Sequence, residues 1–224
     1  MKKALSLLSA LALVGTLAAC DSDDDSFIPR DLQGVTAVAS ASPVSQATGA
    51  SDNSTDAANS RAGITKIEGG EIVPRTGGDS ATATSMQGNG VVFSYLRPFG
   101  WTDLPANQAV LVEFGIMHLG TSKPTSTTNI VVAKSIAQDV SIDTWNDDYG
   151  YTMSKAFGIV EFTKYTSGGQ VYYEVHRNVG GIAMTQTIGL LIKDGVVYEV
   201  GLTTTPDAVD ELRADFAEFM HSLG

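Results

Sequence analysis

The sequence predicts an α+β fold for residues 91–224, and two features near the end of the chain predict it. Four apolar runs of strand length follow one another there and are joined by Gly-containing turns: 157–165, 170–178, 181–193 and 196–203. Short turns between such runs are typical of antiparallel hairpins. A helix with a single apolar stripe then closes the chain, so it has one face to lay on the sheet.

The turn between the last two runs and the closing helix carry the clearest local signals. Asp194-Gly195 suits a tight hairpin, because such a turn requires positive backbone dihedral angles that glycine adopts freely. Thr205-Pro206-Asp207 then combines a helix cap, a proline for the first turn and an acidic residue. This sequence predicts a helix that ends near Leu223, with apolar residues recurring every three or four positions.

Earlier elements follow from the same kinds of pattern. Residues 91–96, 109–114 and 130–136 are β-branched or aromatic runs bounded by Gly, Pro and Ser-Thr clusters, so each is predicted to be a strand. Residues 141–156 carry apolar side chains near helical spacing and are predicted to form a helix capped by Ser141.

The N-terminus has the pattern of a bacterial export signal. Lys2 and Lys3 precede an uncharged apolar stretch that is too short to span a bilayer comfortably. Leu17-Ala18-Ala19-Cys20 resembles a bacterial lipobox, after which the cysteine is lipidated. The alternative is that Cys20 is only a small residue at an ordinary cleavage site. The sequence thus predicts a signal peptide over 1–19 and an acylated, palmitate-bearing lipoprotein anchored at Cys20 in the cell membrane, with multiple chains that make the attachment stable.

The net negative charge of the chain argues against some classes of partner. The formal net charge is -11, and losing Lys2 and Lys3 takes it to -13. Nucleic acid is a poor partner for so acidic a chain, because phosphate backbones are bound mainly by Lys and Arg. Attachment to the membrane must therefore come from the lipid.

Residues 20–90 are rich in Ser, Thr, Ala, Gly and Asp and are predicted to be a disordered stalk. Within them, residues 64–73 have enough apolar positions to form a small hairpin that joins the domain. The run 21–25 begins like a calcium loop, but Ser26 stands where that loop needs glycine, so a solvated tether is favoured. In a Gram-negative host, Asp21 resembles the signal that keeps a lipoprotein on the periplasmic face of the inner membrane; otherwise the protein faces the outside of the plasma membrane.

Two stretches resemble the PsbP-like superfamily. They are Phe93-Ser94-Tyr95-Leu96-Arg97-Pro98-Phe99-Gly100-Trp101, and residues 196–200 followed by 203–206 and the closing helix. The family includes an extrinsic photosystem II protein, the Ran-binding Mog proteins and envelope lipoproteins of the LpqN and DcrB kinds. The resemblance implies an antiparallel sheet of about six or seven strands with helices on both faces, with Pro98 and Trp101 in the core. It also implies a binding or assembly role without catalysis.

No catalytic pattern stands out. Gly-x-Ser-x-Gly, Ser-x-x-Lys, a phosphate loop and a dinucleotide fingerprint are all missing from the sequence, and neither a cofactor nor a resident metal is predicted. Glu174 and His176 lie two residues apart on one predicted strand and share a face, so a pair of metal ligands is one interpretation. A polar stripe is the favoured one. Asp147 and Asp148 suit a cation or a sugar, but the acidic face of a helix explains them as well.

These observations predict a non-catalytic, lipid-anchored binding or assembly accessory for another envelope protein. The alternative is a small-molecule or metal-binding lipoprotein, or less readily a metal-dependent hydrolase, with a pocket between sheet and helix. The residues predicted for the ligand or partner surface are Trp101, Trp145, Tyr149, Glu174 and His176.

Overall fold

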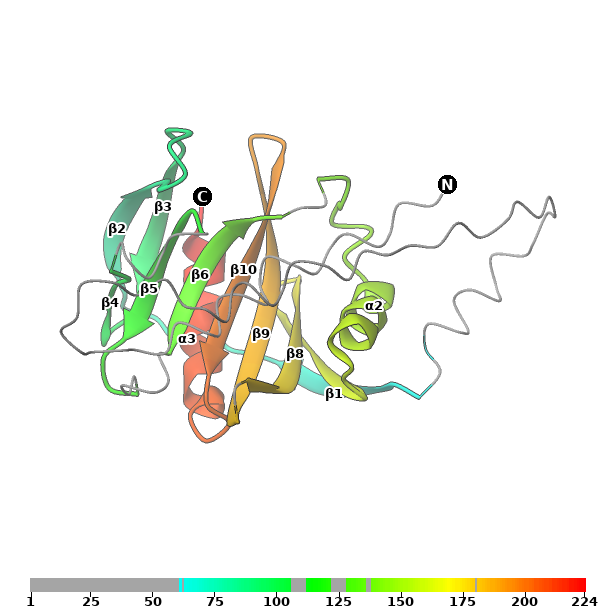
Figure 1. The fold of residues 1–224 in the computed structure, drawn as a ribbon. Coiled ribbons are helices and arrows are strands. Elements are labelled where there is room, and N and C mark those ends of the chain that lie inside the picture. The colour runs from blue at the N-terminus through cyan, green and yellow to red at the C-terminus, as the bar shows by residue number, and fades with distance from the viewer. Residues whose placement is uncertain (1–60, 62, 106–111, 122–127, 136–137, 180) are drawn as a thin grey trace, which may run out of the picture.

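The computed structural model describes residue 61 and residues 63–105, 112–121, 128–135, 138–179 and 181–224. These residues form a mixed α+β fold with a large sheet and two helices, α2 (Asp147–Phe157) and α3 (Val209–Ser222) (Figure 1). The strands in chain order are β1 (Thr65–Glu71), β2 (Asp79–Thr84), β3 (Val92–Arg97), β4 (Trp101–Asp103), β5 (Phe114–His118), β6 (Asn129–Lys134), β7 (Glu161–Ser167), β8 (Gln170–Val179), β9 (Ile182–Lys193) and β10 (Val196–Thr204).

Eight strands make the main sheet, in the order β1-β7-β8-β9-β10-β6-β5-β4. Only β1 runs parallel to its neighbour, β7, and every other pair is antiparallel. The predicted hairpins from β7 to β10 are confirmed, and Asp194 has the positive φ of 51° that its turn requires. The predicted number of six or seven strands is too low, because β1 and β4 extend the two ends of the sheet.

The prediction of a disordered stalk over 20–90 is wrong for residues 65–71 and 79–84, which form β1 and β2. β1 pairs with β7, and β2 forms a separate two-stranded sheet with β3. Most side chains of both strands are exposed, so their composition resembles that of a linker. Their order comes from backbone pairing, of β1 with the distant β7 and of β2 with the following β3, which composition does not reveal.

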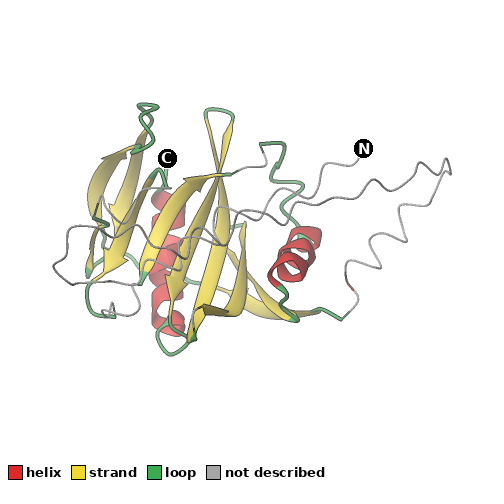
Figure 2. Ribbon diagram, viewed as in Figure 1, coloured by secondary structure: helices red, strands yellow, loops and turns green. Residues whose placement is uncertain are grey.

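Two apolar cores flank the main sheet. Tyr172 of β8 belongs to the core that contains Phe216 of α3, and the adjacent Tyr173 belongs to the core that contains Met153 of α2. Since successive side chains of a strand point to opposite faces, the two cores lie on opposite sides of β8. Figure 2 shows the long helix α3 running along the sheet and the shorter α2 near the end of the sheet that β1 and β7 form.

The β2–β3 hairpin packs on the α3 side of the sheet. Phe93 and Tyr95 are buried there, with ring centroids 5.1 and 5.2 Å from Phe114. Ser94 and Gly224 exchange two backbone hydrogen bonds of 2.9 and 3.0 Å, so the chain pairs with β3 two residues after α3 ends. This hairpin therefore closes one side of the core that α3 shares with the sheet.

Some element boundaries differ from those predicted from the sequence. α2 begins at Asp147 with Asn146 as its cap, whereas Ser141 forms a separate turn with Thr144. The strand predicted over 109–114 is displaced to Phe114–His118, and residues 109–111 lie outside the described residues. α3 begins at Val209, after a turn in which the Ala208 N–H donates to the Thr205 carbonyl. Neither described helix is long and apolar enough to cross a bilayer.

Candidate functional site

The five residues predicted for the ligand or partner surface lie in three different places. Trp101 is on β4, Trp145 lies just before α2 and Tyr149 in its first turn, and Glu174 and His176 lie on β8. None of them lines the hollow that the described residues form on the β2–β3 hairpin.

Trp101 is buried and ties the end strand β4 to α3. Its indole Nε1–H donates to Oδ2 of Asp215 over 2.9 Å, and Asp215 is only 1% exposed. Nε of Arg75 lies 3.0 Å from Oδ1 of the same carboxylate. Burial raises the pKa of Asp215, and the Trp101 hydrogen bond and the charge of Arg75 oppose that rise without cancelling it. Burial of Trp101 and Pro98 agrees with the core role that the family resemblance implies.

His118 lies beside Trp101, directly across the β4–β5 pair. The two ring centroids are 5.2 Å apart. Nδ1 of His118 accepts the backbone N–H of Thr121 over 3.2 Å, so that nitrogen carries no proton in this arrangement. Burial lowers the pKa of His118. Both features favour the neutral form of His118. The sequence did not predict that His118 lies beside Trp101.

Two exposed apolar residues lie at the same end of β4 and β5. Phe99 is 86% exposed and Leu119 is 63% exposed. The Leu119 N–H donates to the carbonyl of Gly100 over 3.0 Å, which places the two residues on adjacent turns. Single exposed apolar residues are ordinary, but Phe99 is the most exposed large apolar side chain in the described part of the molecule. Phe99 and Leu119 are called the Phe99–Leu119 patch below.

Glu174 and His176 share a face of β8, as the sequence predicts, but each has a partner within the chain. Glu174 is 2% exposed, and its two carboxylate oxygens accept from Nε and Nη2 of Arg213 over 2.7 and 2.6 Å. Thr187 donates to the same carboxylate over 2.9 Å. Nδ1 of the exposed His176 lies 2.9 Å from Oγ1 of Thr185. A metal ion at Glu174 would have to displace Arg213, and no group of three metal-binding side chains occurs among the described residues.

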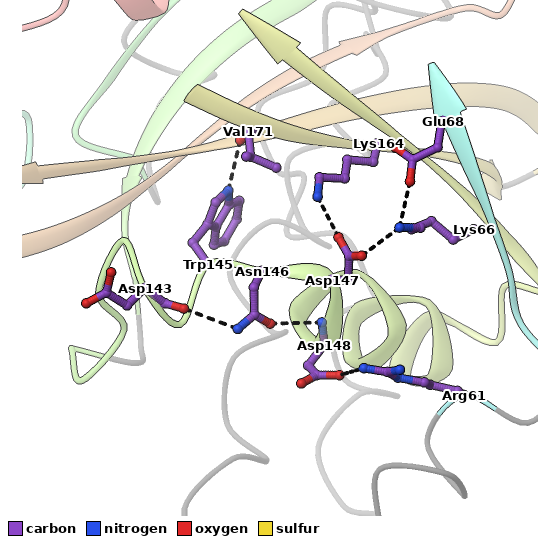
Figure 3. A network of polar contacts seen from close by, with 10 residues as sticks. All are labelled: Arg61, Lys66, Glu68, Asp143, Trp145, Asn146, Asp147, Asp148, Lys164 and Val171. Carbon is purple, nitrogen blue, oxygen red and sulfur yellow. Dashed lines mark hydrogen bonds and ion pairs between the residues drawn. The ribbon is translucent and has the colours of Figure 1, made fainter. Parts of the chain in front are cut away.

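Trp145 and Tyr149 belong to the core beneath α2. They are 3% and 7% exposed, and their ring centroids are 3.9 Å apart. Nε1 of Trp145 donates to the carbonyl of Val171 over 2.9 Å, which ties the start of α2 to β8 (Figure 3). Both residues hold α2 on the sheet, and neither faces the open hollow described below.

The acidic pair at the start of α2 is neutralised by cations of the same chain (Figure 3). Asp147 accepts from Lys66 of β1 over 2.6 Å and from Lys164 of β7 over 2.8 Å. Asp148 accepts from Arg61 over 2.6 Å. Burial acts to raise the pKa of Asp147, but the two lysines outweigh it and the pKa is lowered. These contacts hold β1 against α2, so the arrangement supports a structural role for both aspartates.

Glu199 is a buried carboxyl group that the sequence analysis did not select. It is 3% exposed on β10, and the hydroxyl of Ser135 donates to it over 2.7 Å. Burial raises its pKa to about 7. The only sequence signal was an acidic residue between Tyr198 and Val200 in an otherwise apolar strand. Gln138 lies close by and bonds both the N–H and the carbonyl of Val197 over 3.0 Å.

The described residues also form an open hollow of about 420 Å³ on the β2–β3 hairpin. Its walls are mostly small and hydroxyl-bearing: Ser80, Ala81, Thr82, Ser94, Tyr95, Leu96 and Ser222. None of the five predicted site residues lines it. Cys20, the predicted lipidation site, lies outside the described residues.

Comparison with known proteins gives structural likeness only. No family model matches the chain, and no curated protein sequence matches it significantly. Its structure is similar to that of cyanobacterial PsbP from Synechocystis sp. PCC 6803, with 17% identity, a TM-score of 0.39, and coverage of 66% of this chain and 94% of that one.

Two further structures are similar. LpqN of Mycobacterium tuberculosis, which is involved in cell envelope biogenesis, has 13% identity and a TM-score of 0.39 over 70% of this chain and 87% of that one. The Ran-binding protein Mog1p of Saccharomyces cerevisiae has 9% identity and a TM-score of 0.36 over 66% of this chain and 96% of that one. These are the kinds of protein named by the family resemblance in the sequence.

Proposed function

We propose that this chain is a bacterial envelope lipoprotein, anchored by acyl chains on Cys20, and that its folded domain is a non-catalytic binding or assembly accessory for another envelope protein. The charged start, the apolar stretch and Leu17-Ala18-Ala19-Cys20 support the anchor. Asp21 places the protein on the periplasmic face of the inner membrane in a Gram-negative host. In another host it faces outward from the plasma membrane.

The observation that carries the proposed binding role is the Phe99–Leu119 patch. Its two turns are joined by the hydrogen bond from Leu119 to Gly100, and the adjoining Trp101 is anchored on Asp215. A large apolar side chain on a rigid support loses little conformational entropy on binding, which favours it as an anchor in a protein–protein contact.

The absence of catalysis is proposed from the partners of the candidate residues. Glu174 is bound by Arg213 and Thr187, and Asp147 is bound by two lysines. A carboxylate bound by a cation of its own chain is a poor general base, because the cation stabilises its charged form.

A small-molecule binder is the second candidate function, and the hollow on the β2–β3 hairpin favours it. Its volume of about 420 Å³ is in the range of small-ligand sites, and its Ser and Thr hydroxyls offer hydrogen bonds. The hollow is open, however, and the aromatic side chains that dominate most ligand sites contribute to it only through Tyr95.

Site-specific photo-crosslinking tests the proposed partner surface. A photoreactive amino acid at position 99 or 119 of the full, membrane-bound chain should give the same protein adduct from both positions. Val160, which is 71% exposed, provides the matched control, and crosslinking from it should not give that adduct. Equal labelling from all three positions, or no adduct from 99 and 119, would contradict the proposed surface. Saturable binding of a small molecule that Ser94→Trp blocks would instead favour the hollow.

A further inference from the structure

Arg177 of β8 differs from the other arginines that the structure describes. Arg61, Arg75, Arg97 and Arg213 each lie within 3.0 Å of a carboxylate oxygen, on Asp148, Asp215, Asp103 and Glu174 respectively. Arg177 is half-buried, and no carboxylate in the described part of the chain pairs with it. Acidic residues outnumber basic ones by 25 to 14 in this chain, so the missing partner is not explained by a shortage of carboxylates.

The Arg177 guanidinium is held in one orientation. Its Cζ lies 4.1 Å from the centroid of the Phe157 ring, at the end of α2. Its Nη1 donates over 2.7 Å to Oε1 of Gln186, which is 2% exposed and lies on the neighbouring strand β9. Gln186 in turn donates from Nε2 to the hydroxyl of Thr203 over 3.3 Å. A buried amide thus fixes one arm of the guanidinium, and an aromatic ring supports its flat face.

The remaining arm is open. Nε and Nη2 of Arg177 have no hydrogen-bond partner in the described part of the chain, and neither atom is sealed from solvent. These two groups form the fork that binds two oxygens of a carboxylate or phosphate side by side. Arg213 shows the same fork in use, since its Nε and Nη2 bind the two oxygens of Glu174.

The electrostatic setting leaves the charge of Arg177 uncompensated by any acidic group among the described residues. Burial lowers the pKa of Arg177, and burial is the sole cause of the shift. The face of Phe157 and the negative end of α2 offset part of this cost. A bound oxyanion would offset the remaining cost of burying the charge of Arg177.

We propose that Arg177, positioned by Phe157 and Gln186, is a binding site for an oxyanion, either a carboxylate or a phosphate group. The site lies on β8 at the end of α2 and does not include the Phe99–Leu119 patch or Cys20. It therefore does not depend on the proposed lipid anchor or on the proposed partner surface. The anion has two possible sources: a phosphorylated small molecule or a carboxylated one.

Isothermal titration of the full chain in detergent tests the site. The probes are inorganic phosphate and acetate, each at constant ionic strength against a chloride control. Saturable binding of phosphate, of acetate or of both is expected, and the preferred probe identifies the source. Arg177→Gln should weaken that binding at least tenfold, and Arg177→Lys, which keeps the charge but loses the fork, should weaken it nearly as much. Arg61→Gln is the matched control and should leave binding unchanged, because Asp148 already occupies Arg61.

Gln186→Glu keeps the proposal testable if changes at Arg177 disturb folding. This change keeps the shape of the side chain and gives Arg177 a carboxylate partner inside the protein. It should abolish phosphate and acetate binding while the protein stays folded by circular dichroism. Heats equal to those of the chloride control, or undiminished binding in both Arg177→Gln and Gln186→Glu, would overturn the proposal.

Discussion

Trp101 donates its indole N–H to the buried carboxylate of Asp215 over 2.9 Å, and this bond joins β4, the strand at one end of the main sheet, to α3. The turn formed by Phe99 and Gly100 directly precedes Trp101 and leads into β4. The bond therefore links the fold to the surface proposed for a partner. The contribution of this hydrogen bond to the free energy of unfolding depends on the charge of its acceptor, the Asp215 carboxylate.

Replacing Trp101 with Phe should lower the free energy of unfolding by about 2–3 kcal/mol, because a buried carboxylate loses a donor. Trp145→Phe is the matched control. It removes a similar indole bond whose acceptor is the neutral carbonyl of Val171, and it should cost about 1 kcal/mol less. Urea denaturation of both variants measures the difference. Equal losses would show that the charge of Asp215 has no special role.

Replacing Arg213 with Met should lower the free energy of unfolding by about 3–5 kcal/mol, because Glu174 is then left buried and charged without a partner. The double variant Glu174→Met plus Arg213→Met should recover much of this loss. Arg61→Met, at an exposed ion pair with Asp148, should have no resolvable effect. Denaturation curves of all four proteins decide the point. A loss in the double variant as large as that in Arg213→Met, or larger, would contradict the inference that the pair acts as a unit.

Glu199 should make the protein less stable as the pH rises. Its pKa is about 7 in the folded state, against 4.5 as the ordinary value. Between these two pH values the folded state keeps a proton that the unfolded state has lost, so the free energy of unfolding falls by up to about 3 kcal/mol as the pH increases. Above pH 7 both states have lost the proton, and below pH 4.5 both states keep it. In neither range does Glu199 make the free energy of unfolding change with pH.

Glu199→Gln removes this contribution while keeping a group that can bond with Ser135. The difference between the stability of the unchanged protein and that of the variant should therefore slope between pH 4.5 and 7. Urea denaturation at a series of pH values measures it. Parallel pH profiles for the two proteins would show that Glu199 does not hold a proton in the folded state.

The meander from β7 to β10 could be predicted from the sequence because its strands are apolar, long and separated by glycine turns. β1 and β2 could not be predicted in the same way. Gly69 of β1 shows why. A Cβ at this position would come within 2.2 Å of the Tyr165 ring, so close packing against β7 requires glycine. In the sequence, glycine there is typical of a linker and not of a strand. β4 has only three residues, which is too short for any periodicity to show.

The functional residues were harder to predict than the fold, because their partners are distant in sequence. Glu174 and His176 do share a strand face, yet the interaction that defines Glu174 comes from Arg213, 39 residues later. The aspartates that suggested a cation site are neutralised by Arg61, Lys66 and Lys164, which lie on other elements. Spacing identifies which side chains share a face, but it does not identify what packs against that face.

The central claim is that Cys20 anchors the protein to a membrane, and mass spectrometry of the mature N-terminal peptide tests it most directly. The protein should be extracted from the membrane fraction of its host, and its first residue should be Cys20 carrying acyl chains. Cys20→Ser should move the protein, still folded, to the soluble fraction. A mature N-terminus at Met1, or an unmodified Cys20 in membrane-bound protein, would contradict the claim.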